Sequence, residues 1–128
     1  MKVSNILETA LYAEDLEAAE AFYTRVLGLE VHSRLPGRHV FFRSGVGMFL
    51  VFNPNETEKG DSPHGCRGRG HVAWAVPEEE LDNWREWLEG KKVKVRVFLW
   101  PGGYRSLYFS DPAGNSLELT CPQGWNIS

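Results

Sequence analysis

The sequence has few cysteines, no excess of positive charge and no long apolar run. Cys66 and Cys121 are its two cysteines among 128 residues, and they form no CxxC pair. Because no export signal follows Met1, we expect free thiols rather than a disulfide. The net charge of -3 provides no basic stripe for nucleic acid, and no apolar run approaches the roughly 20 residues of a membrane span. We therefore expect a soluble, cytoplasmic protein whose partners include neither nucleic acid nor membrane.

The composition is that of one globular domain. Hydrophobic residues make up 42% of the chain and aromatic residues 12%, which is enough for one well-formed core. A chain of this length is too short for two independent domains of ordinary size. We expect a single domain over residues 1–128.

The first half of the chain has the pattern of a strand, a helix and three more strands. Residues 6–13 predict a strand, and Asp15 then stands where a helix N-cap belongs. Apolar residues recur at helical spacing up to Gly28, which predicts the end of the helix. Three β-like runs follow, separated by Pro-Gly and Gly-rich turns. The first module, residues 5–53, therefore reads β-α-β-β-β.

The same order of elements restarts after a polar segment. Residues 54–69 are rich in Asn, Glu, Lys, Gly and Ser, which predicts a surface linker. Then come a strand in "GHVAWAV", a helix opened by Pro77 and closed by Gly90, and three more strand-like runs. Residues 70–122 thus form a second β-α-β-β-β module. The chain is an internal duplication of units of about fifty residues.

One carboxylate interrupts the apolar last strand, "NSLELT". Strand side chains alternate between faces, so Leu117 and Leu119 face one way and Glu118 the other. In "GHVAWAV" the same alternation puts His71 on a face of small residues, opposite a bulky face. Such a small or polar face is suited to lining a cavity.

Neither His71 nor Glu118 indicates a site by itself. A lone histidine on a strand is usually structural, and a lone glutamate on an edge strand is usually solvated. Glu8, however, begins the matching strand of the first module, opposite His71 in the duplication. Glu8, His71 and Glu118 are therefore candidate metal ligands, since a cation would offset the cost of burying the two carboxylates.

Three motifs resemble one family. "EDLEAAEAFYTRVLGLEV", "GHVAWAV" and "YFSDPAGNSLELT" are similar to segments of the vicinal oxygen chelate superfamily. It contains glyoxalase I, ring-cleaving extradiol dioxygenases, methylmalonyl-CoA epimerase and the fosfomycin and bleomycin resistance proteins. The resemblance extends over nearly the whole chain. It implies an α+β fold in which two βαβββ modules form a cup-shaped mixed sheet around a metal ion.

The resemblance also implies which positions hold the metal. In the family the ligands come from the first and last strands of each module, which correspond here to Glu8, His71 and Glu118. The remaining position falls in "MFLVF", nearest to Val51 or Phe49, and carries no acid. Glyoxalase I keeps an acid there, and many relatives have histidine where Glu8 stands. The set of two carboxylates and one imidazole suits Fe, Mn, Ni, Co or Zn.

The resemblance implies a metal-dependent enzyme whose small substrate chelates the cation through two neighbouring oxygens. The reaction is left open between glyoxalase-type lyase or isomerase chemistry, epimerisation and ring-cleaving dioxygenation. Glu8 or Glu118 is the candidate catalytic base. The alternative is a metal-free protein that binds a drug or another small molecule, as in bleomycin resistance. The resemblance further implies a homodimer, either side by side or with modules exchanged between chains. If the modules are exchanged, Glu8 would meet His71 and Glu118 of the partner subunit.

Other side chains are candidates for substrate contact. Arg105 is suited to an anionic group, and Tyr108 resembles a tyrosine that some relatives keep near the metal. His39 and Arg43, on the middle strand of the first module, are candidates of the same kind. Two of them have a plain alternative: a solvated strand arginine for Arg105, and packing against the helix for Tyr108.

Overall fold

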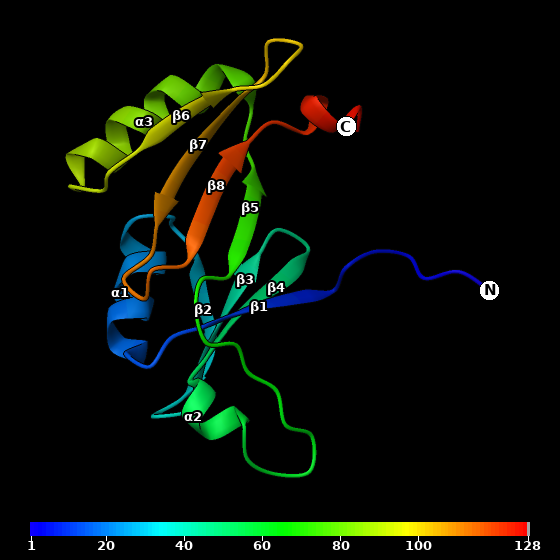
Figure 1. Ribbon diagram of the computed structural model, residues 1–128, viewed down its shortest axis with the longest axis vertical. Helices are drawn as coiled ribbons and strands as arrows, with labels where there is room; N and C mark the ends of the chain where they lie inside the picture. Colours follow the sequence, from blue (N-terminus) through cyan, green and yellow to red (C-terminus); the bar gives the residue numbers. More distant parts are fainter. Residues whose placement is uncertain (128) are drawn as a thin grey trace. The chain divides into compact units, whose positions relative to one another are not determined.

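The computed structural model describes residues 1–127 and divides the chain into two compact units, residues 1–70 and residue 71 onward. Each unit has a four-stranded mixed sheet with one long helix, so the two βαβββ modules expected from the sequence are confirmed (Figure 1). In the described part of the chain, none of the helices has the length and apolarity needed to cross a bilayer.

The first unit is a mixed sheet in the order β1-β4-β3-β2. Its first strand runs parallel to β4, and the other neighbours are antiparallel. The elements are β1 (Glu8–Tyr12), α1 (Leu16–Arg25), β2 (Glu30–Leu35), β3 (His39–Ser44), β4 (Gly47–Phe52) and α2 (Pro54–Thr57).

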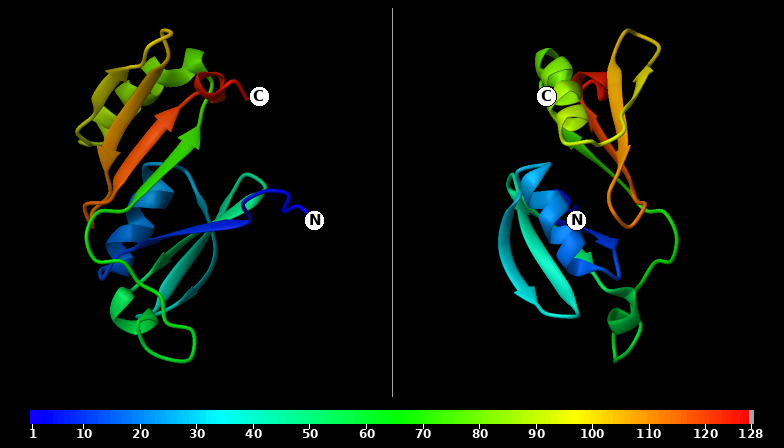
Figure 2. Two further views of the ribbon diagram at one scale, coloured as in Figure 1. Left: turned by 45° about the vertical axis from the view of Figure 1, so that its right-hand side comes forward. Right: turned by 90° about the vertical axis from the view of Figure 1, so that its left-hand side faces the viewer.

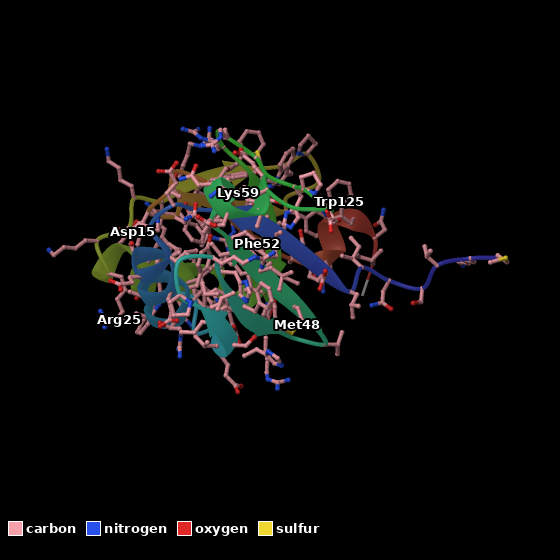
Figure 3. All side chains as sticks on the ribbon, turned by 90° about the horizontal axis from the view of Figure 1, so that it is seen from below. Asp15, Arg25, Met48, Phe52, Lys59 and Trp125 are labelled. Atoms are coloured by element: carbon pink, nitrogen blue, oxygen red, sulfur yellow. The ribbon has the colours of Figure 1, made fainter. Side chains whose placement is uncertain are left out.

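Local signals in the sequence define both ends of α1. The side chain of Asp15 accepts a hydrogen bond from the Ala18 backbone N–H at 3.0 Å, which is the predicted N-cap. Gly28 follows the helix with φ +69, and the next residue, Leu29, donates to the Tyr23 carbonyl. Figure 3 shows Asp15 and Arg25 at the two ends of the helix.

The core of the first unit lies between α1 and one face of the sheet (Figure 2). Tyr23 is fully buried, and its ring centroid lies 5.6 Å from that of Phe42 and 4.8 Å from that of Phe49. The opposite face of the sheet carries the alternate residues of the same strands, including His39 and Phe52.

The linker prediction was wrong at its start. Residues 54–57 form the single-turn helix α2, in which Pro54 and Thr57 are buried. Asn53 caps this turn by accepting from the Asn55 backbone N–H at 3.1 Å. The signal was present in the sequence, since a proline after asparagine is typical of a first helical turn.

The second unit repeats the arrangement, with its sheet in the order β5-β8-β7-β6. Here β5 is parallel to β8, and the remaining pairs are antiparallel. The elements are β5 (His71–Ala75), the 3-10 turn η1 (Glu78–Glu80), α3 (Leu81–Gly90), β6 (Arg96–Leu99), β7 (Arg105–Ser110), β8 (Ser116–Thr120) and the 3-10 turn η2 (Pro122–Trp125).

The start of α3 differs from the prediction, and its end agrees with it. Pro77 precedes a 3-10 turn rather than opening the helix, whereas Gly90 is the last helical residue, as expected. The left-handed residue after the helix is Lys92, at φ +62. Leu81 and Leu88 are fully buried and anchor the helix to the sheet.

The entry to β8 is held by one side chain. Asp111 is 5% exposed and accepts hydrogen bonds from the backbone N–H groups of Ala113 and Asn115, each at 2.9 Å. Its second oxygen accepts from the Asn115 side chain at 2.9 Å. The tight turn seen in the sequence therefore has a buried carboxylate at its centre, and this fixes where β8 begins.

Candidate functional site

Two neighbouring parallel strands bring His71 and Glu118 together. Glu118 of β8 lies beside Ala73 of β5, and His71 is two residues earlier on the same face of β5. His71 Nε2 and Glu118 Oε2 are 3.3 Å apart. The strand alternation that predicted a shared face for these two residues is thereby confirmed.

This face of the second unit is hollowed into a cavity of about 420 Å³. It lies over β5, β7 and β8, between the turn that follows β6 and the 3-10 turn η2. The lining residues are His71, Ala73, Trp100, Pro101, Tyr104, Tyr108, Glu118, Thr120, Gly124 and Trp125. As the alternation predicts, the sheet contributes only small or polar residues and one tyrosine.

Glu118 is enclosed, with 8% of its surface exposed, and hydrogen bonds compensate for its burial. The hydroxyl of Ser106, itself fully buried, donates to Glu118 Oε1 at 2.5 Å. The indole N–H of Trp100 in turn donates to Ser106 Oγ at 2.8 Å. Two successive hydrogen bonds, from Trp100 to Ser106 and from Ser106 to Glu118, thus hold Oε1 of the carboxylate, and Oε2 faces His71.

Tyr108 lines the same cavity, as the sequence proposed. Burial raises the pKa of its phenol, and the nearby charge of Glu118 and a hydrogen bond to that carboxylate raise it further. The phenol therefore stays protonated at neutral pH and can act as a donor. The ring also stacks toward His71, with centroids 6.3 Å apart.

A hydrogen bond to the backbone determines which ring nitrogen of His71 carries the hydrogen. Nδ1 lies 2.9 Å from the Ser116 carbonyl oxygen, an acceptor, so Nδ1 carries the hydrogen and donates. In the neutral imidazole Nε2 is then an acceptor, and it faces another acceptor, Glu118 Oε2, at 3.3 Å. Two acceptors at this distance are stable when a proton or a cation lies between them.

The donor set fits a divalent metal ion. Imidazole nitrogen and carboxylate oxygen are common ligands, and a ligand histidine usually bonds its other nitrogen to a carbonyl or carboxylate. Ligand bonds of about 2.0–2.2 Å at the tetrahedral angle place the two donor atoms roughly 3.4 Å apart, close to the 3.3 Å found here. His71 and Glu118 are therefore suited to two positions of a metal site.

No third His, Cys, Asp or Glu joins this pair within the described residues of the second unit. Glu8, the third predicted ligand, belongs to the first unit, where it is an exposed residue at the start of β1. It holds the same place in β1 that His71 holds in β5, since each is the first residue of its strand.

The strand register corrects the predicted equivalent of Glu118. In the first unit Leu50 lies beside Ala10, and in the second Glu118 lies beside Ala73; each alanine is the third residue of its strand. The matching position is thus Leu50, one residue before the predicted Val51. The buried carboxylate of the second unit corresponds to a leucine in the first.

Arg105 does not line the cavity. It lies on the other face of β7, where its guanidinium donates to Glu78 Oε1 at 3.0 Å and to Asp82 Oδ1 at 2.7 Å. These two carboxylates raise its pKa. The expectation that Arg105 holds an anionic substrate group at this site is wrong, because its charge is already paired beside α3.

His39 and Arg43 belong to β3 of the first unit. His39 stacks on Phe41 with ring centroids 3.9 Å apart, and burial followed by the charge of Arg38 lowers its pKa. Arg43 is exposed and lies 3.8 Å from Glu30. Neither is in the second unit's cavity.

Ser106 is the site residue that the sequence analysis missed. Its signal was the alternation in "RSLYFS", which puts Ser106 on the same face as Tyr108 and opposite Leu107. A serine alone in an apolar strand has no distinctive signature, so its partner Glu118 was the information needed to single it out.

Comparisons with known proteins agree with this fold. The family model described as Glyoxalase/Bleomycin resistance protein/Dioxygenase superfamily matches residues 5–119. A crystal structure titled lactoylglutathione lyase from Agrobacterium tumefaciens is 42% identical, with a TM-score of 0.95 over 99% of this chain and 100% of that one. Metallothiol transferase FosB of Lysinibacillus sphaericus (strain C3-41) is 26% identical over 126 residues, which is 93% of this chain and 83% of that protein.

A more distant structure shows the same fold alone. The fosfomycin resistance protein FosX from Listeria monocytogenes is 21% identical, with a TM-score of 0.73, and the match covers 94% of each chain.

Proposed function

The chain belongs to the Glyoxalase/Bleomycin resistance protein/Dioxygenase superfamily, and from this membership we propose that it is a metal-dependent enzyme acting on a small molecule with two neighbouring oxygen atoms. The observation that supports the proposal is the His71–Glu118 pair, two acceptors 3.3 Å apart at a cavity of about 420 Å³. A cavity of this size falls in the range of small-molecule sites.

We propose Glu8, His71 and Glu118 as the metal ligands. A divalent ion bound there would act as a Lewis acid toward the substrate oxygens. Fe, Mn, Ni, Co and Zn all suit one imidazole and two carboxylates. The hydrogen bond between His71 and the Ser116 carbonyl supports this role, since it holds the ring with Nε2 toward Glu118.

Among the reactions of the superfamily, we favour a glyoxalase-type isomerisation. The support is the 42% identical protein titled lactoylglutathione lyase. The substrate would be the thiol adduct of a 2-oxoaldehyde, in which hydroxyl and carbonyl oxygens sit on adjacent carbons. Ring cleavage by a dioxygenase remains the second reaction type to test.

We propose Glu118 as the base that moves the proton in such a reaction. Of the residues that line the cavity it is the one carboxylate, and the Ser106 hydroxyl holds it by a hydrogen bond. Once free of the metal, its Oε2 would take the proton from the carbon bearing sulfur and return it to the neighbouring carbon. The hydrogen of the hydroxyl group would pass to the former carbonyl oxygen, so each bond broken is replaced and no external oxidant or reductant is needed. Glu8 is the second candidate for this base.

The proposal is tested by turnover of methylglyoxal adducts with glutathione and with smaller thiols, with catechols in parallel. We expect metal-dependent conversion of a thiol adduct, and a loss of at least about 100-fold in kcat for Glu118→Gln, the size typical of a lost general base. No turnover with any of the five metals, or full activity of Glu118→Gln, would contradict it.

A metal-free binding protein of the bleomycin-resistance type is the alternative. The aromatic lining formed by Trp100, Tyr104 and Trp125 favours it. In that case the protein would bind a small molecule equally well with and without metal, and it would convert none of the substrates above. We propose a homodimer for either function.

A further inference from the structure

The cavity of the second unit has two chemically different parts. His71 and Glu118 provide charge and metal-ligand atoms. The rest of the wall is built mainly from aromatic rings, which are those of Trp100, Tyr104, Tyr108 and Trp125. A substrate that places two oxygens near Glu118 would therefore have its neighbouring substituent among these rings.

The polar atoms of the aromatic part are largely engaged within the protein. The indole N–H of Trp100 donates to Ser106, and the hydroxyl of Thr120 donates to the Arg105 carbonyl at 3.0 Å. All residues lining the cavity are described, and none of them is Lys or Arg. An anionic substituent would find no opposite charge among the lining residues and would lose its hydration.

The rings leave apolar surface uncovered. Trp100 is 42% exposed and Trp125 is 78% exposed. Burying such surface against a ligand is favourable at about 25 cal/mol per Å², and aromatic rings gain further from stacked or edge-to-face contact. These rings are thus a part of the cavity that a flat apolar group would cover well.

Trp100 is also held in place. Its ring packs against Phe98 with centroids 4.6 Å apart, in addition to its hydrogen bond with Ser106. Gly124 of η2 lies next to Tyr104, at a distance where an added Cβ would be in ordinary contact 3.6 Å from the ring. A side chain that is already fixed, such as Trp100, loses little entropy when a ligand binds.

We propose that the substrate carries an aromatic ring next to its two neighbouring oxygens, and that Trp125, Trp100 and Tyr104 bind this ring. The inference rests on the proposed function and narrows its substrate to aryl compounds, such as the thiol adduct of an aryl 2-oxoaldehyde. Trp100 would then have two roles: it contacts the substrate ring, and it supports the Glu118 carboxylate through its hydrogen bond to Ser106.

Two hydroxamates test this inference. Benzohydroxamate and acetohydroxamate present the same two oxygens and differ in having a phenyl or a methyl group. We expect calorimetry to give a Kd for benzohydroxamate lower on the order of tenfold, which is what burying a ring in place of a methyl group provides. Cyclohexanecarbohydroxamate, apolar but not flat, should bind more weakly than benzohydroxamate.

Substitutions of single residues test which side chains cause the preference for the phenyl probe. Trp125→Ala should remove most of the difference between the two Kd values. Trp87→Ala is the matched control, because Trp87 is another exposed tryptophan of this unit, 48% exposed, that does not line the cavity. Equal binding of phenyl and methyl probes, or a phenyl preference that survives in both Trp125→Ala and Tyr104→Ala, would overturn the inference.

The preference for an aromatic ring can be tested independently of the proposed function. Since both probes bind through the same oxygens without reacting, a phenyl preference can be measured whether or not the protein turns over any substrate. Turnover of thiol adducts with no preference for aryl over methyl would contradict this inference alone.

Discussion

Glu118 stands between two leucines in β8 and is nevertheless stable as a nearly enclosed carboxylate. Burying such a group without a partner is costly, and the Ser106 hydroxyl supplies one. The Ser106 hydroxyl contributes most directly, through a hydrogen bond of 2.5 Å in a fully buried position. Its role is to position Glu118 with Oε2 toward His71.

This role gives the first prediction. Ser106→Ala removes a hydrogen bond to a carboxylate, so we expect the free energy of unfolding to fall by about 2 kcal/mol. Metal affinity should also fall by roughly tenfold or more, as for other groups that orient a ligand. Ser106→Thr should restore both, and Ser110→Ala, at an exposed site on the same strand face, should change neither. Denaturant titration and calorimetry measure the two effects; unchanged metal affinity in Ser106→Ala would contradict the positioning role.

His39 gives a prediction on pH and stability. Burial and the charge of Arg38 lower its pKa below the ordinary 6.5. The unfolded chain then binds the proton more readily, so the free energy of unfolding falls as pH drops from about 6.5 toward the lower folded value. We expect His39→Gln to flatten this part of the stability profile between about pH 7.5 and about pH 5.5. His32→Gln is the control variant, and a wild-type slope retained in His39→Gln would contradict the prediction.

At the scale of the element, the end of α3 carries a strained residue. Lys92 has φ +62, a conformation that costs a side-chain-bearing residue about 1 kcal/mol or more. Its backbone N–H still bonds the Glu89 carbonyl at 2.9 Å, so the turn is held by its hydrogen bonds rather than by the choice of residue. Glycine would fit this position without strain.

We therefore expect Lys92→Gly to raise the free energy of unfolding by about 0.5–1 kcal/mol, after allowing for the greater freedom of glycine in the unfolded chain. Lys91→Gly is the matched control: with φ -84 it has no strain to relieve, so it should lower stability. Thermal unfolding of the two variants tests this prediction, and equal melting temperatures for Lys92→Gly and Lys91→Gly would contradict it.

The elements were predictable to the extent that their signals are local. Asp15 and Gly28 mark the ends of α1 by capping chemistry, and the alternation in "NSLELT" assigns Glu118 its face. Arg105 was misassigned although the same alternation was available, since it shares the face of Leu107 rather than that of Tyr108. Its two acidic partners lie 23 and 27 residues away in the chain, so no local pattern pairs them.

At the scale of the molecule, the duplication and the missing acid of its first half were visible in the sequence, but the exact position that matches Glu118 required the strand register. Leu50 occupies in the first unit the position that Glu118 occupies in the second, so the two units contribute differently to any metal site. Each unit alone supplies fewer than three of the proposed ligands: His71 and Glu118 in one and Glu8 in the other. Which copy of the first unit provides Glu8 depends on assembly, which a sequence pattern does not encode.

The proposed dimer follows from this division of ligands. We expect sedimentation at micromolar concentration to give twice the mass of one chain. If Glu8 comes from the partner, refolding a mixture of Glu8→Gln and His71→Ala chains should restore part of the metal binding that each variant lacks. A monomer at that concentration would contradict the dimer.

The most direct test is a metal titration of the intact protein. Calorimetry with Mn, Fe, Ni, Co and Zn should find at least one ion that binds to each chain at one site. His71→Ala and Glu118→Gln should each weaken that binding by at least about 100-fold, and Glu8→Gln should also weaken it, because each removes a proposed ligand. His32→Ala, a histidine elsewhere on an exposed strand, should bind as wild type does. Failure of all five metals to bind wild type, or undiminished binding by His71→Ala and Glu118→Gln, would contradict the assignment of this pair as a metal site.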